Sequence, residues 1–284
     1  MKTLNLQLGA ATVALTIAAF GLTAGQAQAG FALGDSVTYT NDGSANGGYD
    51  DATLNIVGGN PSLTGKTLAD GHTIGWSSWN GSDSFGVRAG ADMLVADDTT
   101  SKTTATLTAW CVDILHFSGS GSFKVGGLST LTDGMTLDAA RTNQIAALVV
   151  NGTNDLATNS LTVGGVKYSA DEFSAAIQLA IWTVAYQSAS GDTGYNVGSG
   201  DFYISGASND DITLAGDFLR DVTTGNWTSG GETVFQLDNI AGGTEQQLVF
   251  AQAATSVPEP ASLALLSTGL LGLGALRRRR SFQA

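Results

Sequence analysis

The single cysteine of the chain, Cys111, carries the side chain best suited to act as a nucleophile. A thiol becomes a nucleophile once it loses its proton, whereas a buried free cysteine packs as a small apolar side chain. Cys111 lies in the predicted strand Thr103–Leu115. Alternation along that strand places it on one face with Ala105, Leu107 and Ala109. Because there is no second cysteine, an exported chain would have to protect this thiol without an internal disulfide.

Other kinds of chemical site have little support in the sequence. His72 and His116 are the two histidines, and with one cysteine they do not make a closed zinc site. His116 follows Cys111 by five residues, either as an exposed strand end or as an aid to proton transfer. No Gly-x-Ser-x-Gly nucleophile elbow is present in the sequence. Clusters of Asp, Asn and Gly at Asn41–Asp51 and Gly191–Asp201 could bind calcium through oxygen ligands, but they lack EF-hand spacing and are typical of turns. We therefore predict neither a metal site nor a cofactor.

Two short motifs lie on either side of a predicted helix. The first reads Trp110-Cys111-Val112-Asp113, and the second reads Ile177-Gln178-Leu179-Ala180-Ile181-Trp182. The helix between them ends in an Asn-Gly pair, QIAALVVNG, at residues 144–152. In this order the motifs resemble the bacterial surface thioester-domain family, over about residues 103–187. Ile177 stands where that family has threonine, and Trp110 stands where tyrosine is commoner.

The resemblance implies that the Cys111 thiol attacks the side-chain amide of Gln178, expels ammonia and leaves an internal thioester. Forming this bond requires near-attack geometry, and keeping it requires a pocket without water. Trp182, one helical turn beyond Gln178, is expected to cover the bond, with Trp110 and Asp113 in supporting positions. A surface amine or hydroxyl would then be acylated once, so we expect attachment to a partner and not the turnover of an enzyme.

Each of these residues also has a purely structural interpretation. Cys111 can be a buried thiol, Gln178 a core glutamine bonded to nearby backbone, and Asp113 a strand-end residue. Two functions follow. The first is a covalent surface adhesin or matrix cross-linker, and the alternative is a non-covalent structural or adhesive component of an extracellular matrix or biofilm. A hydrolase acting on exopolysaccharide has no recognisable set of catalytic residues in this sequence.

Short strands joined by turns are the elements that must position these residues. Gly, Ser, Thr, Asn and Asp separate short runs of Val, Ile, Leu, Phe and Thr, which is typical of β structure. The predicted strands are Ser36–Thr40, Thr73–Trp76, Phe85–Val95, Thr103–Leu115, Phe202–Ser205, Thr233–Leu237 and Gln247–Ala251. A further hairpin is predicted where Gly164-Gly165 separates two short apolar runs.

Two predicted helices interrupt the strands. The first covers Leu137–Val150, with Asn151-Gly152 as its stop. The second begins after the capping box Ser169-Ala170-Asp171-Glu172 and carries apolar residues at helical spacing. The predicted fold is therefore α+β, mainly antiparallel β-sheet with a small helical insert.

Both ends of the chain have the pattern of targeting segments. Lys2, an apolar stretch from Leu6 to Leu22, and Ala27-Gln28-Ala29 are typical of a cleaved secretory signal peptide over residues 1–29. At the other end Pro258-Glu259-Pro260 precedes a sixteen-residue apolar span, Ala261 to Leu276. Arg277, Arg278, Arg279 and Arg280 follow it and would hold its end on the cytoplasmic side. The span is near the lower length limit for a transmembrane helix.

Pro-Glu-Pro, the short span and the arginine cluster together resemble the PEP-CTERM sorting signal, in a segment predicted over residues 256–284. The resemblance implies recognition by an exosortase-type processing enzyme and cleavage near Pro-Glu-Pro. It also implies transient anchoring in the inner membrane by the C-terminal helix, then delivery to the cell surface or the exopolysaccharide matrix.

The segment between the two ends, predicted as one domain over residues 30–255, is strongly acidic. Residues 30–257 contain 7 lysines and arginines and 24 aspartates and glutamates, a net charge of about −17. Such a surface disfavours nucleic acid, which is bound through Lys and Arg, and favours cations or polycationic partners. A chain of this length can bury a substantial core.

Overall fold

The computed structural model describes residues 30–45, 48–57, 63, 65–67, 82–116, 119–131, 134–188, 194–240 and 245–252. The predicted signal peptide, the C-terminal sorting segment and the predicted strand Thr73–Trp76 lie outside these residues. Within the described part of the chain, no helix combines the length and the apolar character needed to cross a membrane.

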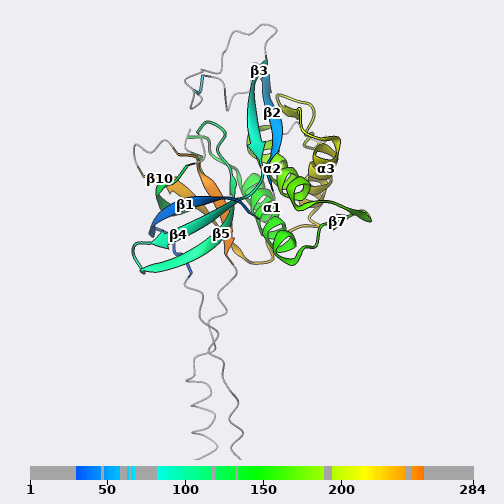
Figure 1. The fold of residues 1–284 in the computed structure, drawn as a ribbon. Helices are drawn as coiled ribbons and strands as arrows, with labels where there is room; N and C mark the ends of the chain where they lie inside the picture. Colours follow the sequence, from blue (N-terminus) through cyan, green and yellow to red (C-terminus); the bar gives the residue numbers. More distant parts are fainter. Residues whose placement is uncertain are drawn as a thin grey trace, which may run out of the picture.

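An antiparallel barrel forms one side of the molecule (Figure 1). Its closed strand order is β1-β4-β5-β11-β10-β6. The strands are β1 (Ser36–Ser44), β4 (Asp92–Asp98), β5 (Thr103–Cys111), β6 (Gly121–Gly127), β10 (Thr233–Asn239) and β11 (Leu248–Gln252). The two C-terminal strands complete the barrel, because β11 pairs with β5 and β10 pairs with β6.

A smaller sheet and a hairpin complete the β structure of the described residues. The sheet has the order β3-β2-β9, with β2 (Asp50–Val57) between β3 (Ser82–Ala89) and β9 (Phe202–Ser205). The hairpin joins β7 (Thr162–Val163) to β8 (Val166–Lys167), as the Gly-Gly turn predicts. The structure confirms the α+β class with mainly antiparallel strands.

In the described part of the chain, three helices pack beside the barrel, namely α1 (Ala139–Thr158), α2 (Ala170–Tyr186) and α3 (Asn209–Thr224). Helix α1 lies against β5, β10 and β11, and α2 packs between α1 and α3 and against the smaller sheet. Every residue of α2 from Phe173 to Tyr186 is buried. A helix buried on all sides is held in one orientation by its neighbours, so the polar side chains within it have fixed positions.

The capping box predicted for α2 is present. The Glu172 N–H donates to Ser169 Oγ (3.2 Å), and the Ser169 N–H donates to Glu172 Oε2 (2.7 Å). Two of the otherwise unpaired groups at the helix start are thereby satisfied.

The predicted end of α1 was wrong. The helix continues through Asn151 and Gly152 to Thr158, and it ends at Asn159, whose backbone is left-handed (φ 54°). The Asn151 side chain donates to Ala147 O (2.7 Å) and Thr228 O (3.0 Å), so it supports the helix instead of stopping it. Gly152 is needed for packing, since a Cβ there would lie 3.1 Å from Ile177 Cγ2 on α2.

Two strand boundaries were also wrong. The predicted strand Phe85–Val95 is two strands, β3 and β4, which belong to different sheets and separate at Gly90 and Ala91. A Cβ at Gly90 would lie 3.0 Å from the Gly48 carbonyl oxygen, so the chain can change sheets there because the residue is glycine. The predicted strand Thr103–Leu115 ends at Cys111, and the next four residues form a turn.

Strands β2 and β6 and helix α3 were not predicted from the sequence. Helix α3 begins with Ser208-Asn209-Asp210-Asp211, a second capping box. The buried residues Leu214, Ala215, Phe218, Leu219 and Val222 have helical spacing and were the available signal.

Candidate functional site

The structure brings Cys111 and Gln178 together, although 67 positions separate them in the chain. The backbone N–H of Cys111 donates to Gln178 Oε1 (3.0 Å), and Gln178 Nε2 donates to the backbone carbonyl of Cys111 (2.7 Å). Gln178 is fully buried and Cys111 is 8% exposed. The side-chain amide of one residue is thus locked to the main chain of the other by a reciprocal pair of hydrogen bonds.

This contact exists because β5 extends beyond its neighbour β4. The Val112 N–H donates to Gln247 O (3.0 Å), so the N–H and C=O of Cys111 point away from β11. They face the edge that β4 would cover, but the ladder between β4 and β5 ends at the pair Asp92 and Ala109. The Gln178 carboxamide therefore takes the place of a missing strand at the barrel edge.

The Cys111 thiol contacts a buried carboxylate that the sequence analysis did not identify. Cys111 Sγ donates to Asp92 Oδ2 at 3.8 Å. Asp92 Oδ1 accepts hydrogen bonds from Tyr49 Oη (2.5 Å) and Asn41 Nδ2 (3.1 Å). No signal in the sequence points to Asp92, because its place depends on strand register: it starts β4 and lies opposite Ala109, two residues from the cysteine.

The electrostatic surroundings of Cys111 keep its sulfur protonated. Burial raises the pKa of the Cys111 thiol well above its usual value, and the negative charges of Asp92 and Asp113 raise it further. A protonated, buried thiol reacts slowly with external reagents. Attack on an amide from this position requires a group that removes the proton.

Tyr39 adds an unpaired hydroxyl to the same region. Burial raises the pKa of Tyr39, and the nearby negative charges of Asp92 and Glu245 raise it further. Its side chain stacks on Phe123 with ring centroids 4.7 Å apart. The buried Tyr39 hydroxyl has no hydrogen-bond partner among the residues that the structure describes.

The two tryptophans that were predicted to support the site, Trp110 and Trp182, are both buried. Trp182 lies one turn beyond Gln178 on α2, and Trp110 precedes Cys111, pointing to the opposite face of β5 by strand alternation. Neither indole N–H has a hydrogen-bond partner in the described part of the chain. Both residues therefore contribute apolar surface to the core.

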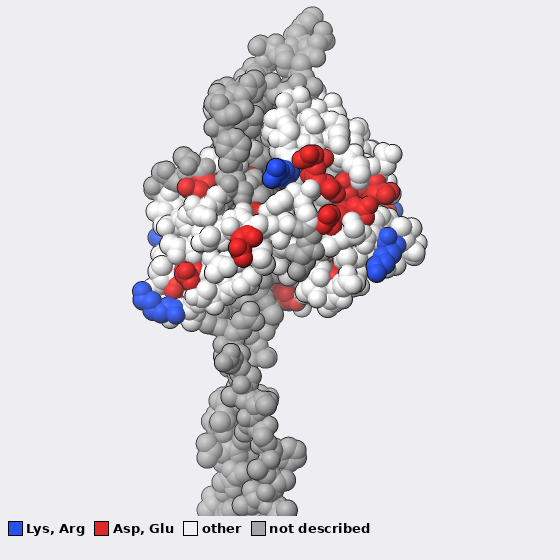
Figure 2. Space-filling view, in the orientation of Figure 1, with Lys and Arg blue, Asp and Glu red and all other residues white. Residues whose placement is uncertain are grey.

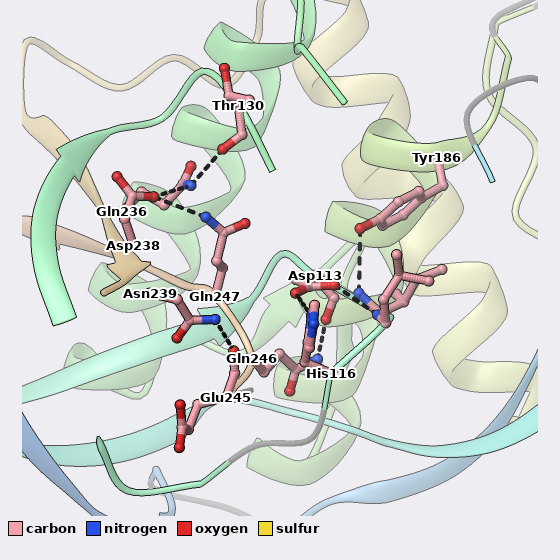
Figure 3. Close-up of polar contacts among 12 residues, drawn as sticks. Asp113, His116, Thr130, Tyr186, Gln236, Asp238, Asn239, Glu245, Gln246 and Gln247 are labelled. Carbon is pink, nitrogen blue, oxygen red and sulfur yellow. Dashed lines mark hydrogen bonds and ion pairs between the residues drawn. The ribbon is translucent and has the colours of Figure 1, made fainter. Parts of the chain in front are cut away.

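Asp113 organises the turn that follows Cys111 (Figure 3). Its Oδ1 accepts from the Leu115 N–H (2.7 Å), and its Oδ2 lies 2.5 Å from His116 Nδ1. Gln246 Nε2 donates to the Asp113 carbonyl oxygen, and the Ile114 N–H donates to Tyr186 Oη on α2 (3.3 Å). These bonds tie the end of β5 to β11 and to the helix that carries Gln178.

A second polar network, also missed from the sequence, holds the neighbouring strand ends (Figure 3). Asp238 Oδ1 accepts from Gln236 Nε2 (2.5 Å) and Gln247 Nε2 (2.9 Å), and Gln236 Nε2 also donates to Thr130 O (2.8 Å). Because the Gln247 carbonyl receives the Val112 N–H, this network fixes the strand beside Cys111. No group of three or more His, Cys, Asp or Glu side chains suited to a metal ion occurs among the described residues.

Residues 256–280 match the model of the PEP-CTERM protein-sorting motif. The tail carries a PEP-CTERM signal. This match confirms the sorting segment predicted from Pro258, Glu259, Pro260 and the four arginines. A PEP-CTERM signal indicates an exported protein that an exosortase processes and that is delivered to the surface or beyond it.

The fold is similar to a solved structure, that of the N-terminal thioester domain of the fibronectin-binding protein SfbI from Streptococcus pyogenes, at 14% sequence identity and a TM-score of 0.37. The match covers 75% of this chain and 98% of that domain. No curated protein matches the chain. Because the structural likeness is distant, the function is inferred from the site itself.

Proposed function

We propose that this PEP-CTERM protein attaches covalently to a partner through an internal thioester between Cys111 and Gln178. The observation that carries the proposal is the reciprocal hydrogen-bonded contact between the two residues in a buried position. That contact supplies what an unreactive amide needs, namely a fixed position beside the thiol-bearing residue.

The reaction conserves all atoms. Cys111 Sγ attacks Gln178 Cδ, the C–N bond breaks, the thiol proton joins the amide nitrogen, and ammonia leaves. The Cys111 N–H, which already donates to Gln178 Oε1, would stabilise the negative charge that develops on this oxygen. An external amine would later attack the same carbon, forming a new amide and returning the Cys111 thiol.

Burial favours survival of the bond until a partner arrives. Thioesters are lost to water, and a fully buried carbonyl with apolar neighbours has little contact with water. The residues on either side of Gln178 in α2, Ile177 and Leu179, are also completely buried, so the carboxamide lies within the core.

The acidic surface favours a partner that is rich in lysine, whose side-chain amine would be the nucleophile. Figure 2 shows acidic side chains gathered over the part of the molecule where α2 and α3 lie, with few basic ones on this face. Such a field raises the local concentration of lysine-rich partners and repels anionic polymers. We therefore propose a protein amine as the acceptor, with a hydroxyl of exopolysaccharide as the other acceptor class.

The reaction would occur once per molecule, so the protein would act as an adhesin or cross-linker and not as an enzyme. We place it at the cell surface or in the exopolysaccharide matrix of a biofilm. Before processing, the C-terminal segment would hold it in the inner membrane.

A non-covalent matrix protein is the second candidate, and one observation favours it. The Gln178 amide satisfies the backbone of Cys111 completely, so its burial has a structural explanation without any reaction.

Intact-mass measurement of the secreted mature protein separates the two functions. The thioester predicts a mass lower than that of the sequence by one ammonia, and a thiol that resists alkylation until methylamine is added. Cys111→Ala and Gln178→Ala should both have the full mass of their sequences. A wild-type protein with its full mass, and a thiol that labels without amine once the protein is unfolded, would leave the non-covalent function.

A further inference from the structure

Asp92 contacts the sulfur of Cys111 with one carboxylate oxygen and is anchored by the other. Tyr49 and Asn41 anchor Oδ1, while Oδ2 lies 3.8 Å from Sγ. Asp92 is buried, with 3% of the residue exposed to solvent. A carboxylate held in this way is aimed at the thiol and cannot turn away without losing both anchors.

The position of Asp92 follows from the same strand geometry that exposes the edge of β5. Asp92 is the first residue of β4 and pairs with Ala109, so it lies on the cysteine-bearing face next to the gap that Gln178 fills. The neighbouring Ala91 N–H donates to Ser174 Oγ on α2 (2.7 Å). Helix α2 thus fixes both the start of β4 and the carboxamide, which holds carboxylate, thiol and amide in one rigid unit.

We propose that Asp92 is the general base and general acid of thioester formation, an inference that rests on the proposed function. Its Oδ2 takes the proton from Cys111 Sγ as sulfur bonds to Gln178 Cδ. It then gives that proton to the amide nitrogen as the C–N bond breaks and ammonia leaves. The carboxylate is restored, and no other reactant is required.

Tyr49 and Asn41 act through Asp92 and are positioning residues. Among the described residues, the other titratable groups that interact with the thiol are Tyr39 and Tyr49, whose pKa values are raised first by burial, and Asp113. Glu245 acts on Tyr39. The hydrogen-bond geometry assigns the thiol to Asp92 and leaves Asp113 bonded to Leu115 and His116.

The test starts from unfolded mature protein in which the Gln178 amide is intact. As the protein refolds, mass spectra record the loss of ammonia and so the rate of bond formation. Asp92→Asn should slow formation by about a hundredfold, a typical contribution of general base catalysis. Asp98→Asn is the matched control, since Asp98 is a buried aspartate at the other end of β4, bonded to Ser101. The control should form the bond at the wild-type rate once folded.

The pH dependence adds a readout that a structural role would not change. With Asp92 as the base, the wild-type rate does not depend on free thiolate, so it should be level around neutrality. Asp92→Asn should instead show a rate that rises with pH, as free thiolate does. The wild-type profile is decisive even where Asp92→Asn does not fold.

The outcomes are distinct. Formation at the wild-type rate in folded Asp92→Asn, or a wild-type rate that climbs steadily through neutral pH, would overturn the role of Asp92. Wild-type protein that never loses ammonia would instead reject the thioester, and with it this inference.

Discussion

Gln178 has two roles that substitution can separate. Its amide completes the hydrogen bonding of a strand edge, and its carbonyl carbon is the proposed acyl group. The first role involves only the backbone of Cys111, so it survives removal of the thiol. The second requires the sulfur.

Cys111→Ala and Gln178→Ala should therefore differ in stability, although neither can form the bond. Cys111→Ala keeps the carboxamide against the backbone and should lose only about 1 kcal/mol. Gln178→Ala leaves a buried N–H and a buried C=O unpaired, each costing about 1–3 kcal/mol, so a loss of at least about 2 kcal/mol is expected. Urea unfolding of both variants measures the difference. Equal losses would mean that the carboxamide does not support the strand edge.

The position of Gln178 depends on how closely α1 and α2 approach. Gly152 on α1 faces Ile177, the residue before Gln178, and a Cβ at Gly152 would lie 3.1–3.3 Å from three atoms of the Ile177 side chain. Ile177 is fully buried and β-branched, so it has little freedom to move. The glycine that was expected to stop α1 instead allows α2 to reach the barrel edge.

Gly152→Ala should destabilise the protein by about 1 kcal/mol and slow bond formation. Overpacking costs about 1–3 kcal/mol, which outweighs the gain of about 1 kcal/mol in helix propensity. Gly216→Ala on α3 is the matched control, since no atom lies within 4 Å of its added Cβ. The control should be neutral or stabilised by up to about 1 kcal/mol in thermal or urea unfolding.

A double variant tests whether the contact between residue 152 and Ile177 causes the loss of stability. Adding Ile177→Ala to Gly152→Ala should cost less than the sum of the two single losses, because the space left by Ile177 accepts the new methyl group. Strict additivity would argue against the contact as the cause.

At the scale of the whole molecule, the acidic groups differ in whether their ionised form favours folding at neutral pH, and Asp50 and Asp211 are two whose ionised form does not. Burial raises the pKa of Asp50, and the charges of Asp171, Glu172 and Asp51 raise it further. Burial likewise raises the pKa of Asp211, with Asp50 and Glu172 adding to the effect. A raised carboxyl pKa means that the folded state prefers the protonated form, so the stabilisation is present at low pH and is lost as the pH rises through the folded pKa.

Asp50→Asn should thus raise the melting temperature at neutral pH, and the gain should shrink as the pH is lowered and wild-type Asp50 becomes protonated. Added salt should reduce the gain as well, because it screens the repulsion.

Asp98→Asn should behave in the opposite way. Burial alone would raise the pKa of Asp98, but hydrogen bonds from Ser101 and Thr100 outweigh it and lower the pKa. Its ionised form is stabilising at neutral pH, and a pH series of melting curves distinguishes the two variants.

Local chemistry was sufficient to predict several features from the sequence. The Ser169–Glu172 capping box, the Gly164-Gly165 hairpin and the PEP-CTERM tail each depend on residues that are close together in the chain. The antiparallel α+β class followed from short apolar runs and turns. Such features require no knowledge of the rest of the fold, which is why the sequence alone determined them.

Only the tertiary structure decided which groups meet at Cys111. Asp92 reaches the sulfur because β4 begins opposite Ala109, and Gln178 reaches the backbone because the same strand leaves an open edge. The closed barrel adds β11 from the far end of the domain. These contacts depend on strand register and helix packing between distant segments, and a shift of one residue would turn each side chain to the other face. The pattern of one sequence does not specify that register, so neighbouring elements must set it.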